Sequence, residues 1–261
     1  MNHNARQTQI ANFILEKGEI SVQNVVDMFH VSAATARRDL DQLAKQQFVV
    51  RTHGGATMAP STGELPLRYR TTGMSAEKTR IAQAVAQSLN PGDSIALNGG
   101  TTTTEIAHEI GTLVSADTRF TRSSLTVITN AVNIAYELCV RDQVQVVLTG
   151  GVAQPHSYEL TGPLTSLVLP AIDIHAVFFG LDAVSVERGA LTSSDDEAAI
   201  GNLFIQAASK VVAVADHTKF SARSFARICP ITAIDQIITD NDLDQTTAQT
   251  IRDAGVDLVL V

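Results

Sequence analysis

The fold of the N-terminal part of this chain is decided by residues 32–46, SAATARRDLDQLAKQ. Ser32 is a favourable residue to cap a helix, and Ala36, Leu40 and Leu43 recur at the spacing of one helix face. This pattern predicts a helix with a narrow buried stripe. Its remaining residues should face outward: Ala33, Ala34, Thr35, Arg37, Arg38 and Asp41.

The segments on either side complete a small domain. Upstream, the apolar spacing predicts a helix over residues 4–17, and Ser21 caps a second, short helix that is followed by a turn at residues 30–31. Downstream, residues 48–58, FVVRTHGGATM, predict two short strands joined by a tight turn. Three short helices and a hairpin predict a winged helix-turn-helix over residues 1–57.

The outer face of the third helix carries groups suited to nucleic acid. The second helix of a helix-turn-helix enters the major groove, where an arginine can form a fork to guanine or bind a phosphate. Hydroxyl groups can reach a phosphate or a base, and small alanines permit close approach. Arg51 and His53 on the hairpin are expected to contact backbone phosphates or the minor groove. The predicted DNA contacts are Ser32, Ala33, Ala34, Thr35, Arg37, Arg38, Arg51 and His53.

Two other interpretations of this region stay open on the pattern alone. The arginines can belong to a three-helix bundle with a solvated surface, or the winged helix can serve protein contacts. Asp39 is expected either at the helix surface or beside an arginine that it orients, because a carboxylate that faces a phosphate is unfavourable.

Charge is unevenly distributed along the chain. Residues 1–57 contain six lysines and arginines against five acidic residues, a net charge of +1. The remaining residues contain 13 against 22, a net charge of −9, and the whole chain carries −8. A mildly basic head beside an acidic body is compatible with a head that approaches DNA while the body stays clear of it.

The bulk composition indicates a globular protein of two domains. The chain has 261 residues, of which 44% are hydrophobic. Cys139 and Cys229 lie far apart in sequence, which fits a reducing compartment better than a disulfide framework. The N-terminus lacks the pattern of a signal peptide, and the most apolar stretch, residues 164–181, is interrupted by Pro170 and Asp173. We therefore expect a cytoplasmic protein without membrane contact.

The larger part of the chain alternates strands and helices. Residues 58–75, MAPSTGELPLRYRTTGMS, are predicted to be a linker. Beyond them, apolar strands alternate with amphipathic helices, which predicts an α/β domain over residues 76–261 with a mainly parallel sheet covered on both faces. The expected strands are 94–97, 126–129, 144–149, 176–180, 211–215, 236–239 and 257–261. The expected helices lie near 76–89, 102–110, 131–140, 195–209 and 244–254.

Residues 94–105, SIALNGGTTTTE, form a strand-to-helix turn rich in hydroxyl groups. Such a turn offers free backbone N–H groups and the positive end of a helix, which suit a phosphate or a carboxylate. It matches neither a P-loop nor GxGxxG, and an ordinary turn remains an alternative. Two further polar or glycine-containing strand ends should lie at the same edge of a parallel sheet. The predicted contacts are Asn98, Gly99, Gly100, Thr101, Thr102, Thr103, Thr129, Asn130, Gly150 and Gly151.

Three charged residues are candidates for the same edge. Asp182 follows an apolar strand, Glu197 lies in SSDDEAA, and Lys219 lies in ADHTKF. Each has a structural alternative: a turn or cap for Asp182, an acidic first helical turn for Glu197, and a solvated side chain for Lys219.

The order and spacing of these motifs resemble one family. The N-terminal part resembles the signature of the DeoR family of bacterial regulators in Arg6-x3-Ile10-x3-Ile14 and, 17 residues later, Ser32-x2-Thr35-Ala36-Arg37-Arg38-Asp39-Leu40. Residues 51–56, RTHGGA, resemble that family's wing. The segments GGTTT, VITN, LTGG, Gly180-x-Asp182 and ADHTKF resemble, in this order, its sensor domain. The resemblance covers essentially the whole chain from about residue 6.

This resemblance implies a sensor domain similar in fold to ribose-5-phosphate isomerase. It places a phosphate at residues 99–103, and Asp182, Glu197 and Lys219 match positions that line the isomerase's sugar site. It implies a transcription regulator of sugar or polyol catabolism, expected to be a repressor, that responds to a phosphorylated sugar or polyol. Because one small head has little interface, we expect a homodimer or homotetramer on paired half-sites of double-stranded DNA.

The sequence departs from the family pattern in three places. Ala183 stands where a glycine usually follows the aspartate, which predicts a stiffer loop, and Ser221 replaces a common glycine. Residues 113–125 are longer and more polar than usual and are expected to form a surface loop, with Arg119 and Arg122 reaching a ligand as the alternative. We expect no cofactor, no metal and no enzymatic activity. The alternatives are a sugar-phosphate isomerase with a DNA-binding head and an interaction-only winged helix.

Overall fold

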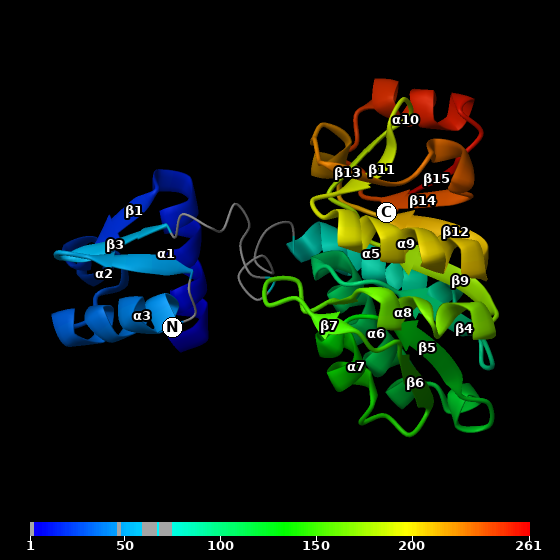
Figure 1. The fold of residues 1–261 in the computed structure, drawn as a ribbon, viewed down its shortest axis with the longest axis horizontal. Helices are drawn as coiled ribbons and strands as arrows, with labels where there is room; N and C mark the ends of the chain where they lie inside the picture. Colours follow the sequence, from blue (N-terminus) through cyan, green and yellow to red (C-terminus); the bar gives the residue numbers. More distant parts are fainter. Residues whose placement is uncertain (1–2, 46–47, 59–66, 68–74) are drawn as a thin grey trace. The chain divides into compact units, whose positions relative to one another are not determined.

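The computed structural model describes residues 3–45, 48–58, 67 and 75–261, which belong to two compact units, Met1–Gly73 and Met74–Val261 (Figure 1). Most of the predicted linker, residues 58–75, lies outside the described residues. The domain boundaries at 57/58 and 75/76 therefore stay a prediction.

In the N-terminal unit, the described residues between 3 and 58 form three helices and a small antiparallel sheet in the strand order β1-β3-β2 (Figure 1). Its elements are α1 His3–Lys17, β1 Glu19–Ser21, α2 Val22–Phe29, α3 Ala33–Lys45, β2 Val49–Thr52 and β3 Gly55–Met58. The predicted helices and hairpin are confirmed, and β1 is a third strand that the sequence analysis missed. This arrangement is a winged helix-turn-helix.

Local chemistry explains where these elements begin and end. Ser21 accepts the Asn24 N–H at 3.0 Å, while Asn24 Oδ1 accepts the Ser21 N–H at 3.1 Å, which forms a capping box at the start of α2. His30 ends α2 in the left-handed region at φ 51°. At Gly55, a Cβ would collide with the Ile20 carbonyl, so only glycine permits β1 to pair with β3.

The core of this unit is formed by all three helices and the sheet. The predicted inward stripe of Ala36, Leu40 and Leu43 is fully buried, as are Ile10 and Ile14 of α1. A helix carrying one buried face must pack against others, and here α1 and the hairpin cover it. The opposite face of α3 is consequently left outside.

The second unit is built on seven parallel strands in the order β15-β14-β12-β9-β4-β5-β6. Their bounds are β4 Ser94–Leu97, β5 Leu125–Thr129, β6 Val144–Leu148, β9 Ile174–Phe179, β12 Ala208–Val214, β14 Gln236–Thr239 and β15 Asp257–Leu260. All seven predicted strands are present, with ends shifted by no more than a few residues. The predicted α/β class with a parallel sheet is confirmed.

Helices cover both faces of this sheet, as Figure 1 shows. One core packs α5, α6 and α7 against the sheet, and the other packs α9 and α10. The bounds of these helices are α5 Ser75–Ser88, α6 Thr101–Ala116, α7 Val132–Leu138, α9 Asp195–Ala207 and α10 Gln245–Asp253. Within the described residues, no helix combines the length and the apolar character that crossing a membrane requires.

Smaller elements, which the sequence analysis did not predict, lie between these. They are the strand pair β7 Val152–Ala153 and β8 Leu160–Thr161, the three-stranded sheet of β10 Ala183–Ser185, β11 Gly189–Thr192 and β13 Ala226–Cys229, the helix α8 Pro163–Ser166, and the 3-10 turns η1 Thr118–Thr121, η2 Leu169–Ala171, η3 His217–Phe220 and η4 Ile231–Ala233. The strands among them pair antiparallel and lie outside the alternation of strands and helices from which the main sheet was predicted.

The prediction of a surface loop over residues 113–125 is wrong in part. Helix α6 continues to Ala116, and Phe120 of η1 is buried in the core. Arg119 is held by Asp117 through an ion pair of 2.7 Å. Because α6 begins at the predicted phosphate turn and runs for 16 residues, roughly 24 Å, Arg119 follows the far end of the helix. The alternative in which it reaches a ligand at that turn is therefore wrong.

The order of the strands defines a switch point at the carboxyl edge of the sheet. The chain runs from β4 to β5 to β6 in one direction, and β9 then pairs with the opposite side of β4. The direction of winding thus reverses between β4 and β9. Open parallel sheets bind ligands at such a switch point, outside the carboxyl ends of the strands.

Candidate functional site

The outer face of α3 presents the predicted DNA contacts. Arg37 and Arg38 are exposed, and so are Ala33 and Ala34. The hydroxyl groups are engaged locally, because Ser32 Oγ accepts the Thr35 N–H at 3.2 Å and lies 3.0 Å from Thr35 Oγ1. Ser32 therefore caps the helix, as predicted.

Asp39 corrects one expectation. It is not at the helix surface, because only 1% of the residue is exposed. Its carboxylate accepts from Arg6 Nε at 2.6 Å and from Arg6 Nη2 at 3.3 Å. The alternative in which Asp39 orients an arginine is correct, and its partner is on α1. This buried ion pair joins the first helix to the recognition helix.

The hairpin is braced against the recognition helix. Arg51 Nε donates to Asp41 Oδ1 at 2.8 Å, and its Nη1 donates to the Gly55 carbonyl. His53 is exposed at the turn. The structure therefore assigns Arg51 a partner within the unit in addition to the DNA contact predicted from the sequence.

Asn98 connects the two strands, β4 and β9, that flank the switch point of the sheet. Its Nδ2 donates to the Gly180 carbonyl at 3.1 Å, and its Oδ1 accepts the Gly180 N–H at 2.8 Å. One amide side chain thus joins the end of β4 to the end of β9. Both of its polar atoms contact protein, so its predicted ligand role stays a prediction.

The turn after Asn98 has the features of an anion site. Gly100 adopts φ 140°, which favours glycine, and no described side chain caps α6, so backbone N–H groups of its first turn are available. Thr103 and Thr104 donate to the Gly100 carbonyl at 3.2 and 2.6 Å. Within the described part of the chain, the hydroxyl groups of this turn without a protein partner are those of Thr101 and Thr102.

Glu159, which the sequence analysis did not single out, lies directly against this turn. It is 5% exposed, and its side chain leaves no room for a Cβ at Gly99. Its Oε2 accepts a hydrogen bond from Asn130 Nδ2 at 2.8 Å. Burial above all, with the charges of Glu197 and Asp182, raises the pKa of Glu159 to about 8, while Asn130 and the Gly99 backbone act to lower it.

The structure brings Asp182 and Glu197 together beside Glu159. Asp182 Oδ2 accepts the Ser193 N–H at 2.9 Å. Thr192 Oγ1 lies 3.2 Å from Asp182 Oδ2 and 3.0 Å from Glu197 Oε2, so one hydroxyl connects the two carboxyl groups. Glu197 also lies in the acidic first turn of α9, and Asp182 in a turn that leads into β10 at Ala183. The structural roles considered for both residues are therefore present as well.

Two lysines supply positive charge near this edge. Lys219 lies in η3, and its ammonium charge interacts with that of Lys78 on α5, a residue that the sequence analysis missed. Lys78 is 8% exposed. Burial lowers its pKa, and the charge of Asp216 opposes that effect. The pattern of α5 gave no signal for Lys78, because a lysine in an amphipathic helix is typical of a solvated face.

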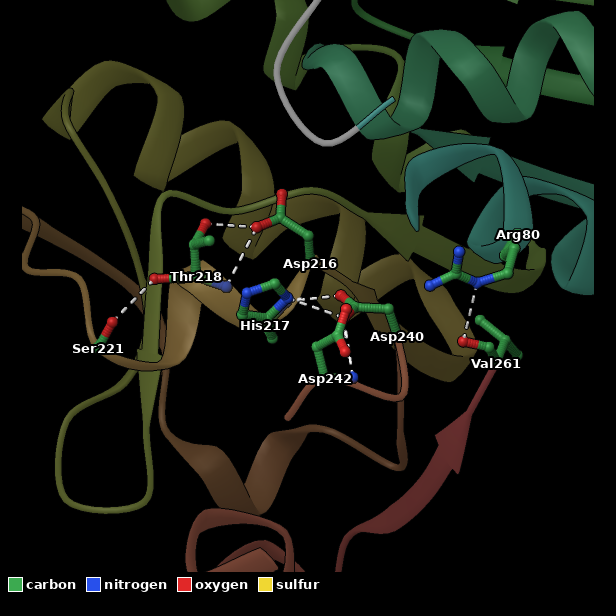
Figure 2. A network of polar contacts seen from close by, with 8 residues as sticks. All are labelled: Arg80, Asp216, His217, Thr218, Ser221, Asp240, Asp242 and Val261. Atoms are coloured by element: carbon green, nitrogen blue, oxygen red, sulfur yellow. Dashed lines mark hydrogen bonds and ion pairs between the residues drawn. The ribbon is translucent and has the colours of Figure 1, made fainter. Parts of the chain in front are cut away.

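A network of acidic groups holds the turn that carries Lys219, as Figure 2 shows. Asp240 is fully buried and accepts the His217 N–H and His217 Nδ1, each at 2.8 Å. Asp216 accepts the Thr218 N–H at 3.1 Å. Ligand atoms of His217, Asp240 and Asp242 lie within 4.8 Å of one another. Hydrogen bonds within the chain account for this cluster, which acts as an anchor for η3.

The remaining predicted contacts lie on the β5–β6 side of the edge. Thr129 Oγ1 donates to the Leu97 carbonyl at 2.7 Å, which ties β5 to β4. At Gly151, φ is 126° and a Cβ would crowd Thr161 and Thr165. Gly150 accepts Thr165 Oγ1 at 2.7 Å. Gly151 is therefore explained by packing and Gly150 by its backbone conformation at φ 79°, and their contact with a ligand stays a prediction.

Family models match both units and define the class of the protein. A model described as a DeoR-like helix-turn-helix domain matches residues 6–62, and one described as the DeoR C terminal sensor domain matches residues 74–241. The chain thus has the architecture of a transcription regulator with a DNA-binding head and a sensor domain. It belongs to the DeoR family.

Relatives match over nearly the full length. The chain is 31% identical over 261 residues to the putative aga operon transcriptional repressor of Escherichia coli O157:H7, with 98% of this chain and 93% of that protein covered. It is 32% identical to the HTH-type transcriptional regulator GlpR of Haloferax volcanii, with 97% and 96% covered. The expected family and the expected class of function, DNA-binding transcriptional regulation, are confirmed.

Solved structures are more distant. A ribose 5-phosphate isomerase from Methanocaldococcus jannaschii aligns at a TM-score of 0.42 and 14% identity, with 57% of this chain and 55% of that chain covered. The sorbitol operon regulator SorC from Klebsiella pneumoniae aligns at a TM-score of 0.37 and 14% identity, with 80% and 88% covered.

Proposed function

We propose that this protein is a repressor of sugar or polyol catabolism genes that is controlled by a phosphorylated sugar or polyol. The observation that carries the proposal is that one chain holds both an exposed arginine face on α3 and, at the switch point of the sheet, a turn with the features of an anion site. The names of relatives support it, among them the glycerol-3-phosphate regulon repressor of Escherichia coli K12, 26% identical over 260 residues with both chains covered completely.

The DNA contact uses α3 in the major groove. Arg37 and Arg38 contact base edges or phosphates, and the small side chains of Ala33 and Ala34 allow the start of the helix to approach the bases. Ser32, Thr35, Arg51 and His53 contact the DNA backbone. The buried Arg6–Asp39 pair supports this by holding the recognition helix on the rest of the unit.

The effector is bound at the carboxyl edge of the sheet. Its phosphate group accepts hydrogen bonds from the turn at residues 99–103 and is balanced by Lys78 and Lys219. Its hydroxyl groups donate to the carboxyl groups of Asp182 and Glu197, which are already oriented by neighbouring hydrogen bonds. The remaining contacts of the proposed site are Asn98, Thr129, Asn130, Gly150 and Gly151.

The active species is a homodimer or homotetramer. One winged helix offers a small interface, and specific regulators gain affinity by engaging two half-sites about one helical turn apart. We further propose that the sensor domain does not turn over its ligand. The competing hypothesis of a sugar-phosphate isomerase predicts measurable conversion of ribose 5-phosphate, and the absence of such conversion is the expected result.

A salt titration tests the DNA-binding part. An operator can be selected from random DNA by the protein itself, and its affinity measured by fluorescence anisotropy over a range of salt concentrations. We expect a steep linear loss of log affinity with log salt, because phosphate contacts release counterions. Failure to select or bind any DNA at low salt contradicts the proposed function.

A thermal-stability screen tests the effector part. A ligand that binds the native state raises the melting temperature by mass action. We expect a phosphorylated sugar or polyol to stabilise the protein, and Thr102→Val and Lys219→Ala to abolish the effect while basal operator binding persists. A broad panel of phosphorylated metabolites that leaves the melting curve unmoved contradicts the sensor assignment.

A further inference from the structure

Glu159 differs from the other acidic groups of the proposed site because it contacts the anion turn itself. Its carboxyl group is packed against Gly99, the first residue of the turn at residues 99–103, where it fills the space of a Cβ, and Asn130 Nδ2 donates to it. Asn130 also donates to the Leu160 carbonyl at 3.2 Å, and its Oδ1 is a buried acceptor without a partner in the described residues. A buried carboxyl group therefore lies against the first residue of the turn at which the phosphate is proposed to bind.

The backbone around Glu159 fixes it in this position. Tyr158 adopts a left-handed conformation at φ 61°, which is costly for a residue other than glycine. It persists because the Tyr158 carbonyl accepts the Val132 N–H at 3.0 Å and the Asn130 carbonyl accepts the Leu160 N–H at 2.7 Å. Two hydrogen bonds to the residues after β5 thus flank Glu159 on both sides. Its carboxyl group is placed at Gly99 by the backbone.

We propose that Glu159 controls the binding of the effector's anionic group: the carboxyl group must be protonated for an oxyanion to bind beside it at the turn. This proposal rests on the sensor site proposed above and adds a residue and a proton to it. In its protonated form Glu159 has one O–H donor to offer to an oxyanion. In its ionised form it repels the oxyanion at short range within a buried site.

The charges that face Glu159 favour this coupling. Glu197 at the start of α9 and Asp182 after β9 both act on it, while Asn130 after β5 is neutral. The cations of the proposed site are Lys78 on α5 and Lys219 in η3. Burial and the charges of Glu197 and Asp182 raise the pKa of Glu159 to about 8, so the group binds a proton near neutral pH. An added dianion raises that pKa further, and binding therefore takes up a proton above pH 8.

Sulfate is the appropriate probe because its charge stays constant across neutral and alkaline pH. Its affinity for the full chain is measured by thermal shift against chloride at equal ionic strength, from about pH 6.5 to 9.5. Above about pH 8 we expect the affinity of the wild type to fall toward tenfold per pH unit, the limit for one linked proton. In Glu159→Gln, residue 159 should contribute less than a twofold change in sulfate affinity over the same pH range.

The control variant is Glu187→Gln, because Glu187 is exposed in the β10–β11 turn and should keep the wild-type profile. Deprotonation of Lys78 also weakens anion binding at high pH, but Glu159→Gln retains that lysine. The ratio of the wild-type affinity to the Glu159→Gln affinity at each pH therefore isolates the effect of Glu159. Calorimetric titration of the wild type with sulfate in two buffers of different ionisation enthalpy measures proton uptake directly. It decides the question if Glu159→Gln does not fold.

The outcomes separate this inference from the proposed function. If sulfate stabilises the wild type but not Thr102→Val, the proposed anion site stands. If, in that case, Glu159→Gln leaves the pH profile unchanged or no proton is taken up above pH 8, the role of Glu159 is overturned. Sulfate stabilisation that survives Thr102→Val places the anion elsewhere and overturns both. The absence of stabilisation at any pH overturns both as well.

Discussion

The two units of this protein arrange their functional groups in opposite ways. In the N-terminal unit, Arg37 and Arg38 lie exposed on a single helix, and their side chains are directed by the helical period alone. In the sensor unit, Glu159, Asp182 and Glu197 come from three separate segments and are buried or half-buried. The difference teaches that the proposed DNA contact belongs to one surface, whereas the proposed ligand site belongs to a packed edge in which each charge depends on its neighbours.

The largest effect should come from breaking the buried ion pair between Arg6 and Asp39 in the N-terminal unit. Arg6→Ala leaves the carboxylate of Asp39 buried without this partner, which should cost about 3–5 kcal/mol of stability. Hydrogen exchange resolved by segment should show faster exchange in α1–α3 and unchanged exchange in the sensor unit. The double variant Arg6→Ala, Asp39→Ala should be less destabilised than Arg6→Ala, and equal or greater loss contradicts the assignment.

The exposed arginines should affect binding without affecting stability. Arg37→Ala and Arg38→Ala should each weaken binding to a selected operator by about 1–3 kcal/mol, roughly 5- to 150-fold. Their melting curves should match the wild type, because both side chains lie outside the core. Lys45→Ala, at the exposed far end of α3, is the matched control. Equal affinities for all three variants would show that another face of the head contacts DNA.

Asp240 tests how strongly the sensor edge depends on buried polar contacts. An asparagine offers one acceptor oxygen where Asp240 offers two, so Asp240→Asn should destabilise η3 by about 1–2 kcal/mol. Hydrogen exchange over residues 216–221 and the affinity for the effector measure this. Asp242→Asn, in which the exposed neighbour is changed, should have little effect.

The pH dependence of the Asp240 contribution has a definite sign. Burial acts to raise the pKa of Asp240, but hydrogen bonds from the backbone and side chain of His217 and from the Asp242 backbone outweigh it and lower the pKa. The stabilisation is therefore present above the unfolded value of about 3.9 and is lost as the pH falls through the lower folded value. An acid-unfolding curve of the wild type should show this loss, and Asp240→Asn should lack it.

The smallest effect should come from the wing. Asp41→Ala releases Arg51 and removes a negative charge from the recognition helix, so operator affinity at low salt should rise about two- to threefold. The slope of log affinity against log salt should become steeper by about one phosphate contact. A fall in affinity would instead show that the Asp41–Arg51 pair positions the wing.

The sequence predicted the seven strands and the recognition helix because their signals are local. Each strand is a short, nearly continuous apolar run, and the stripe of Ala36, Leu40 and Leu43 spans two helical turns. The strands of the small sheets escaped prediction because they pair antiparallel, outside the alternation of strands and helices that marks the main sheet. Asp39 could not be placed, since its partner Arg6 lies 33 residues away.

The candidate site was predictable mainly where it follows a strand. The turn at residues 99–103, Asn130 and Asp182 were found because parallel strands deliver their carboxyl ends to one edge. Glu159 and Lys78 carry no such signal: one is a single acid in a segment without periodicity, and the other is an ordinary lysine of an amphipathic helix. Their contacts with other segments distinguish them.

The sequence by itself determined the class of the protein through the order and spacing of its motifs. It also determined the seven strands of the main sheet and the helix proposed to face DNA, because helical and strand periods act over a few residues. The tertiary structure alone decided that Arg6 neutralises Asp39 and that Glu159 lies on Gly99. The physical reason is that electrostatic and hydrogen-bond energies depend on distance in space and on burial. Both quantities exist only once the chain has brought distant residues together.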